Sequence, residues 1–163
     1  DSMKKVHGMG KRERLYLQLA AMLHDCGKYI SMVNIGETSF EIVMATEIIG
    51  LSHQEREIVA NVVRFNHSRF VYDGQQGALS NLSRDSFLVV AKLTAILRLA
   101  SSLDRSHRQK LRGLHVALRE NQLIFTVDTQ EDLTLERGFF EANGEFFKEV
   151  FSVDLVLKQR KTF

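Results

Sequence analysis

The stretch Leu23-His24-Asp25-Cys26-Gly27-Lys28 decides the fold, because it ends a helical pattern with an imidazole directly beside a carboxylate. In residues 12–26 apolar side chains recur at helical spacing, and Gly27 is expected to stop this helix. A chain that leaves a helix can turn so that both side chains of the pair point at one cation. A divalent ion accepts such a mixed nitrogen and oxygen pair, although an isolated His-Asp dipeptide is more often a surface ion pair or a helix end.

Two capping boxes predict the next helices. Thr38 is followed three residues later by Glu41, which predicts a helix that begins there and is closed by Gly50. Ser52 and Glu55 repeat the pattern and predict a second helix. The sequence therefore predicts two consecutive helices separated by a short turn.

A long apolar segment covers residues 85–104, where hydrophobic side chains occur almost all round the helical projection. This distribution is typical of a helix that neighbours bury on several sides. Before it, residues 73–83 are rich in Gly, Gln, Asn and Ser, which predicts an exposed loop.

The period of the pattern changes after residue 113. Apolar residues alternate in 114–118, in 123–127 and again in 151–157, with Asn121 at the expected hairpin turn. Between the last two segments, residues 136–149 carry four phenylalanines at helical spacing. A small β-β-α-β unit is therefore expected to follow the helices.

These patterns predict a mainly α chain, with a helical bundle over residues 1–110 and a small α+β unit packed on it over 111–163. The 163 residues, 44% of them hydrophobic, can bury a core of ordinary size. No apolar run is expected to approach the roughly 20 residues that a membrane helix needs. The single cysteine, Cys26, cannot form an internal disulfide, which fits a reducing compartment. A net charge of +2 does not indicate specific nucleic-acid binding.

Three ordered segments carry a family resemblance. They are Leu23–Ser31, Gly50–Glu55, and the pair Leu97–Ala100 with Leu103–His107. Together they resemble the C-terminal HD-like domain of the exopolyphosphatase and guanosine pentaphosphate phosphohydrolase (Ppx/GppA) family, in which HD denotes the His-Asp pair. The resemblance spans roughly residues 12–110.

The resemblance implies that the intact protein is a cytoplasmic hydrolase that releases orthophosphate from polyphosphate and uses a divalent cation such as Mg²⁺. Its phosphatase chemistry would lie in N-terminal actin-like ATPase-type lobes, so no catalytic residue and no cofactor is expected in this chain. The domain would instead contribute polyphosphate binding, dimerisation or both. Membrane or specific nucleic-acid partners are not expected, and guanosine pentaphosphate remains open as a substrate.

The HD pattern is incomplete in this sequence. Related members carry a His-rich turn where this chain reads Asn34–Thr38, and another histidine where it has Asn66. His67 lies one position further, and because one residue turns a helix by about 100°, its side chain is expected to point elsewhere. The residues of the degenerate HD remnant, and the only candidate metal ligands, are His24, Asp25 and Asp104. They are interpreted as a hydrogen-bonded group that fixes two helices rather than as a metal site.

A basic segment follows Asp104. The anion-binding candidates are Lys28, Arg64, Arg105, His107, Arg108 and Lys110. Guanidinium groups bind phosphates through paired N–H donors, which suits a polyphosphate chain. The alternative is that these cations are simply exposed to solvent at a helix end, where they interact with the negative pole of the helix dipole.

Two other functions compete with the accessory domain. One is an autonomous metal-dependent HD phosphohydrolase of a nucleotide or a phosphomonoester, in which a metal activates water. The other is a structural or regulatory interaction module that uses an exposed apolar surface.

Overall fold

A computed structural model describes residues 1–70, 72, 82–111 and 113–160. The chain forms two compact units, which we call the helical unit (Met9–Leu97) and the mixed unit (Asp1–Gly8 with Arg98–Phe163). Their division falls within one long helix, α5 (Arg84–Leu103). The sequence-based boundary between residues 110 and 111 stays a prediction.

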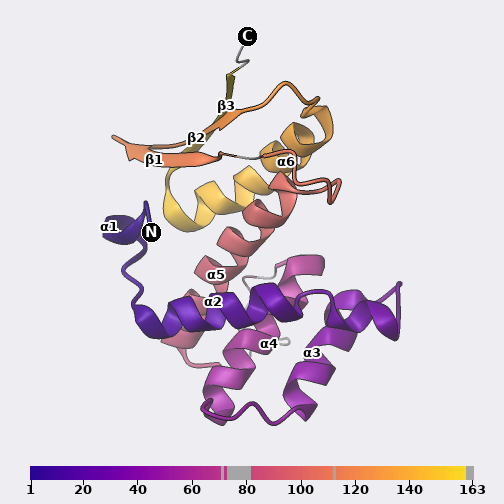
Figure 1. Cartoon of the computed structure of the whole chain (residues 1–163). Coiled ribbons are helices and arrows are strands. Elements are labelled where there is room, and N and C mark those ends of the chain that lie inside the picture. The colour runs from indigo at the N-terminus through magenta and orange to yellow at the C-terminus, as the bar shows by residue number, and fades with distance from the viewer. Residues whose placement is uncertain (71, 73–81, 112, 161–163) are drawn as a thin grey trace. The chain divides into compact units, whose positions relative to one another are not determined.

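The elements confirm a mostly helical chain with a small sheet near the C-terminus (Figure 1). Besides α5, the helical unit contains α2 (Lys11–Leu23), the 3-10 helix η1 (Cys26–Tyr29), α3 (Ile35–Ala45) and α4 (His53–His67). The mixed unit contains α1 (Lys4–His7), β1 (His115–Arg119), β2 (Gln122–Asp128), α6 (Thr134–Phe151) and β3 (Asp154–Arg160).

The second capping box is confirmed and the first is wrong. Ser52 Oγ accepts from the Glu55 amide at 3.2 Å and Glu55 Oε2 accepts from the Ser52 amide at 2.7 Å, a cap that contributes about 1 kcal/mol. The preceding helix begins at Ile35 and ends at Ala45, not near Gly50. Its Thr38 amide already donates to the Asn34 carbonyl at 3.0 Å, so Thr38 lies inside the helix rather than at its cap.

The capping glutamate also connects α4 to α2. Arg12 Nε lies 2.5 Å from Glu55 Oε1, the Tyr16 hydroxyl donates to the same oxygen at 2.7 Å, and Arg12 also donates to the Gly50 carbonyl. The Arg12 hydrogen bond, the Ser52 amide and the Tyr16 hydroxyl hold the pKa of Glu55 well below its usual value. Burial and the hydrogen bond to Glu55 raise the pKa of Tyr16 to about 12. These contacts fix the crossing of the two helices.

The core of the helical unit lies between α4 and the neighbouring helices, with Val59, Val62 and Val63 fully buried. Helix α5 is long and apolar enough to cross a membrane by length and composition alone, so the expectation that no segment reaches this length is wrong. Because 56% of that segment is buried inside the protein, α5 has the burial of a core helix, as its all-round apolar pattern predicts.

The mixed unit has the predicted β-β-α-β order. Strand β1 pairs antiparallel with β2 through the turn at Glu120 and Asn121, and β2 pairs parallel with β3 after the crossover helix α6. Figure 1 shows α6 lying along the sheet, and Phe125 packs edge-on against Phe140 at 5.1 Å between ring centroids. The predicted loop at 73–83 falls almost entirely outside the described residues.

Candidate functional site

The His-Asp pair lies where α2 changes into η1. Helix α2 ends at Leu23, His24 is its C-cap, and Asp25 precedes the 3-10 turn. Gly27 does not stop α2 as expected, since it lies inside η1. Its amide donates to Ser39 Oγ at 2.8 Å, and a Cβ atom at Gly27 would lie only 2.5 Å from that oxygen. The glycine is therefore required by the close approach of η1 to α3.

Asp25 is paired with Lys28 by the geometry of the 3-10 turn. Residues three apart eclipse each other in a 3-10 helix, which places the Lys28 ammonium on Asp25 Oδ2, to which it donates a hydrogen bond. Both side chains are about one-third exposed. Partial burial raises the pKa of Asp25, but the Lys28 hydrogen bond and the charges of His24, Lys28 and His67 outweigh it and leave that pKa below its ordinary value.

His67 joins this cluster, so the expectation that it points elsewhere is wrong. Its Nε2 atom lies 2.8 Å from the His24 carbonyl oxygen and 3.1 Å from Asp25 Oδ1. The His24 and His67 rings are parallel within 5°, with their centroids 6.2 Å apart. His67 is the last residue of α4, and the chain leaving α2 brings the backbone of His24 to it. The expectation rests on the rotation of one residue along α4, and that rotation does not take into account a contact with the His24 backbone.

The carbonyl contacts assign the protons on both rings. A carbonyl oxygen only accepts, so His24 Nδ1, at 2.8 Å from the Ala21 carbonyl, and His67 Nε2 each carry a hydrogen. His67 Nε2–H is directed at the His24 carbonyl, and its approach to Asp25 Oδ1 is electrostatic. The Oδ1 atom is buried and has no hydrogen-bond donor among the described residues. We call His24, Asp25, Lys28 and His67 the HD cluster.

The side chains of the HD cluster do not fit a divalent metal. Lys28 occupies Asp25 Oδ2, and the Nε2 atom of His67 donates its hydrogen to the His24 carbonyl, so it has no lone pair for a metal. Among the residues that the structure describes, no group of three or more His, Cys, Asp or Glu side chains has the spacing of a metal site. Asp104 belongs to the mixed unit, and its association with the pair stays a prediction.

The basic segment after α5 forms a tight turn that Asp104 closes. The Asp104 carbonyl accepts from the His107 amide and its Oδ1 accepts from the Gln109 amide, both at 2.9 Å. His107 and Gln109 have φ values of 52° and 51°, the left-handed conformation that such a compact turn requires. The Arg105 guanidinium lies 4.6 Å from the Phe139 ring centroid. Arg105, His107 and Arg108 are exposed, and we call these three residues the basic turn.

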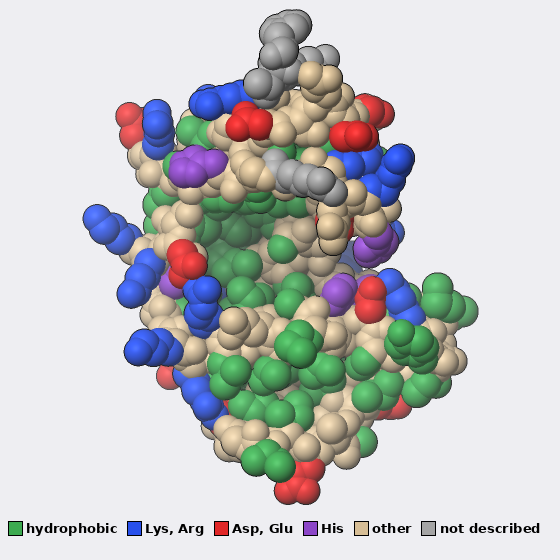
Figure 2. All heavy atoms as spheres, viewed as in Figure 1, with side chains coloured by type: hydrophobic (Ala, Val, Ile, Leu, Met, Phe, Trp, Pro, Cys, Tyr) green, Lys and Arg blue, Asp and Glu red, His purple; other side chains and the backbone are tan. Residues whose placement is uncertain are grey.

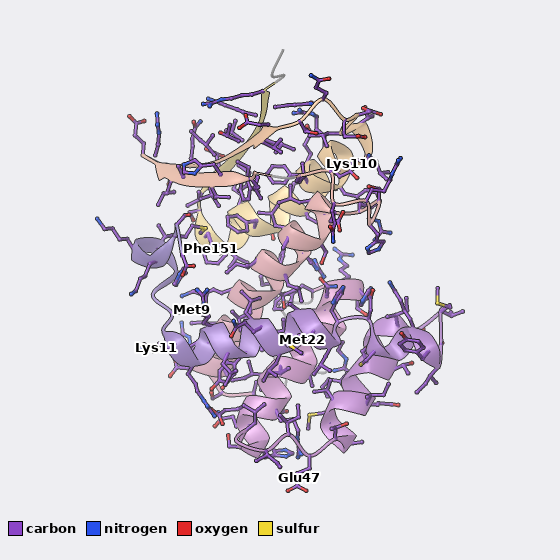
Figure 3. All side chains as sticks on the ribbon, viewed as in Figure 1. Met9, Lys11, Met22, Glu47, Lys110 and Phe151 are labelled. Atoms are coloured by element: carbon purple, nitrogen blue, oxygen red, sulfur yellow. The ribbon has the colours of Figure 1, made fainter. Side chains whose placement is uncertain are left out.

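The other predicted anion contacts are engaged with carboxylates. Lys110 Nζ lies 3.1 Å from Glu136 Oε2 and also donates to the Asp132 carbonyl, beside the start of α6 (Figure 3). Arg64 pairs with Glu37 and stacks on the Phe40 ring at 3.9 Å. Lys28 pairs with Asp25, as described above.

Glu136 is a residue of this site that no sequence pattern indicates. It is fully buried, and the Ser106 hydroxyl donates to its Oε1 at 2.5 Å. A single glutamate in the first turn of a helix normally indicates a solvent-exposed side chain that interacts favourably with the positive end of the helix dipole. No pattern in the sequence connects it to Ser106 and Lys110, which lie 30 and 26 residues away.

A family model described as Ppx/GppA phosphatase, domain III, matches residues 2–143, which is most of the chain. The chain belongs to the Ppx/GppA phosphatase family. The match confirms the resemblance and identifies the chain as domain III, so proteins of this family contain other domains as well. No curated protein matches the chain.

Proposed function

We propose that this domain III is an accessory domain of an exopolyphosphatase-like phosphohydrolase and that it binds polyphosphate through the basic turn. The intact cytoplasmic protein would release orthophosphate from polyphosphate, with its catalytic carboxylates and a divalent cation such as Mg²⁺ held in other domains. The observation that carries this proposal is the exposure of Arg105, His107 and Arg108 within one turn of a domain of this family.

The surroundings of the basic turn support a contact on its outer side. Stacking on Phe139 restricts the Arg105 guanidinium while the residue stays exposed, which lowers the entropy lost when it binds a phosphate.

Arg108 also borders a cavity of about 430 Å³ whose lining includes the carboxylates Asp128 and Glu131. Because these carboxylates repel phosphate, the cavity itself is a poor polyanion site.

The double variant Arg105→Ala/Arg108→Ala is expected to bind long-chain polyphosphate about tenfold more weakly at low salt, because two charge-assisted contacts are lost. Wild-type affinity should also fall steeply as salt is raised. Fluorescence anisotropy of labelled polyphosphate measures both effects. The matched control is Lys4→Ala/Lys5→Ala, which removes the same charge from exposed residues of the same unit.

Equal losses in the two double variants would show that polyphosphate responds only to net charge and would exclude the basic turn as its site. Absence of binding by the wild-type chain at low salt would exclude the polyphosphate role altogether. Competition by guanosine pentaphosphate in the same assay shows whether the basic turn binds that nucleotide as well as polyphosphate.

An apolar segment favours self-association as a second role. Tyr29, Ile30, Met32 and Val33 are 96%, 71%, 70% and 90% exposed, and Figure 2 shows hydrophobic side chains on this surface of the helical unit. Contiguous exposed apolar side chains commonly mark a protein interface, and we propose a second copy of this chain as the occupant.

The variant Ile30→Ser/Val33→Ser is expected to shift a wild-type dimer to monomer, because it removes two apolar anchors from the interface. Sedimentation velocity at several concentrations measures this shift. The control is Leu88→Ser on α5, which also replaces an exposed apolar side chain with serine but lies outside the segment. A monomeric wild-type chain would rule out this role.

A further inference from the structure

We propose that Lys28 is a built-in substitute for a metal ion, so that the HD cluster is a structural site whose carboxylate is already neutralised by an ammonium group. In this assignment Lys28 and His67, rather than a metal, surround the carboxylate of the His-Asp pair. It concerns the helical unit and is independent of the basic turn.

The local backbone places the ammonium where a cation is needed. In an α-helix a residue three positions on is rotated by about 300°, whereas in a 3-10 helix it completes a full turn and lies over the first residue. The change from α2 to η1 therefore aligns Lys28 with Asp25. The close packing of Gly27 on Ser39 keeps η1 in this position.

The remaining atoms of the cluster are arranged around this ammonium. His24 Nε2 lies 3.6 Å from Asp25 Oδ2, the oxygen that Lys28 binds. A metal held by those two atoms would need to lie about 2 Å from each and thus against the ammonium. The metal cation and the Lys28 ammonium would repel each other at such close range, so Asp25 Oδ2 can bind one of them but not both. Asp25 Oδ1 does not provide an alternative, because His67 Nε2 lies 3.1 Å away and carries the hydrogen that it donates to the His24 carbonyl.

The test compares wild type, Lys28→Met, Asp25→Asn and the double variant in Mn²⁺ titrations followed by electron paramagnetic resonance. Wild type is expected to show no saturable site. Lys28→Met is expected to gain one weak, saturable Mn²⁺ site that wild type lacks, since removing a partly exposed charge relieves only screened repulsion. The double variant is expected to lose this gain. Lys148→Met is the matched control, because it removes a lysine paired with Asp154 in the mixed unit.

Thermal unfolding gives a second readout. If Lys28 neutralises Asp25, Lys28→Met lowers the unfolding midpoint and Asp25→Asn restores part of the loss in the double variant, because no unpaired carboxylate is then left.

Two results would overturn the proposal. The first is saturable Mn²⁺ binding by the wild-type chain that Asp25→Asn abolishes, and this measurement does not depend on whether any Lys28 variant folds. The second is a folded Lys28→Met protein that neither gains Asp25-dependent Mn²⁺ binding nor shows coupling to Asp25 in unfolding.

Discussion

Replacing Gly27 with alanine is expected to lower the free energy of unfolding by about 3 kcal/mol, because the added methyl group overpacks a rigid contact. The new Cβ would lie 2.5 Å from Ser39 Oγ, 2.6 Å from the Ile35 carbonyl oxygen and 2.7 Å from the Ser39 amide nitrogen. Two of these atoms belong to the backbone of α3 and cannot rotate away. Urea denaturation followed by circular dichroism measures the change.

The control is Gly138→Ala in the second turn of α6, where a Cβ atom would meet nothing within 4 Å. There the substitution is expected to stabilise the protein by about 0.5–1 kcal/mol, because alanine has the higher helix propensity. If Gly27→Ala were as stable as wild type, close packing of η1 on α3 would not be the reason for glycine at this position. The same variant should also disturb the Lys28–Asp25 contact, since Gly27 lies between the two residues.

Local patterns predicted the elements whose determinants lie within a few residues. The Ser52–Glu55 box, the all-round apolar pattern of α5 and the alternation in β1, β2 and β3 each describe a short segment, and the structure has all of them. The Thr38–Glu41 box has the same sequence pattern but lies inside α3, where Asn34 already supplies the helix start. A cap motif therefore predicts that a helix is near but not where it begins.

Contacts between distant segments account for the parts of the site that sequence did not predict. The side-chain direction of His67 follows from the His24 backbone, 43 residues away. The sequence predicts a helix stop at Gly27 because glycine commonly has that role, whereas its role here depends on the position of Ser39. The sequence indicates candidate cations by their charge, and charge alone does not reveal that Lys28, Arg64 and Lys110 already have carboxylate partners.

The substitution Lys110→Met is expected to lower the free energy of unfolding at pH 7 by about 3 kcal/mol, because it leaves the buried Glu136 carboxylate without its counter-ion. Glu136 is fully buried and the Lys110 side chain is only 12% exposed. The double variant Lys110→Met/Glu136→Gln should recover part of the loss, which a double-mutant cycle in urea quantifies. Lys148→Met, whose partner Asp154 is half exposed, should change stability by less than about 1 kcal/mol.

The pH dependence of this loss follows from the pKa of Glu136. Burial raises that pKa, but the Ser106 hydroxyl, the backbone and Lys110 outweigh burial and hold it below its ordinary value. The carboxylate thus stabilises wild type above the unfolded-state pKa, and this contribution is lost as pH falls through the lower folded-state pKa. In Lys110→Met the buried carboxyl takes up a proton more readily, so the stability difference between the two proteins should narrow from pH 7 to about pH 4.

The same variant separates a structural lysine from an anion contact. If Lys110 bound polyphosphate at the surface, Lys110→Met would weaken polyphosphate binding and leave the unfolding free energy almost unchanged. The contacts of Lys110 with Glu136 and the Asp132 carbonyl predict the reverse. Lys110→Met should then lose much stability and only a little affinity for polyphosphate. That smaller loss would be indirect, because Ser106 shares Glu136 with Lys110 and lies between Arg105 and His107 of the basic turn. Glu136 would then determine the shape of the turn that presents the remaining cations to the polyanion.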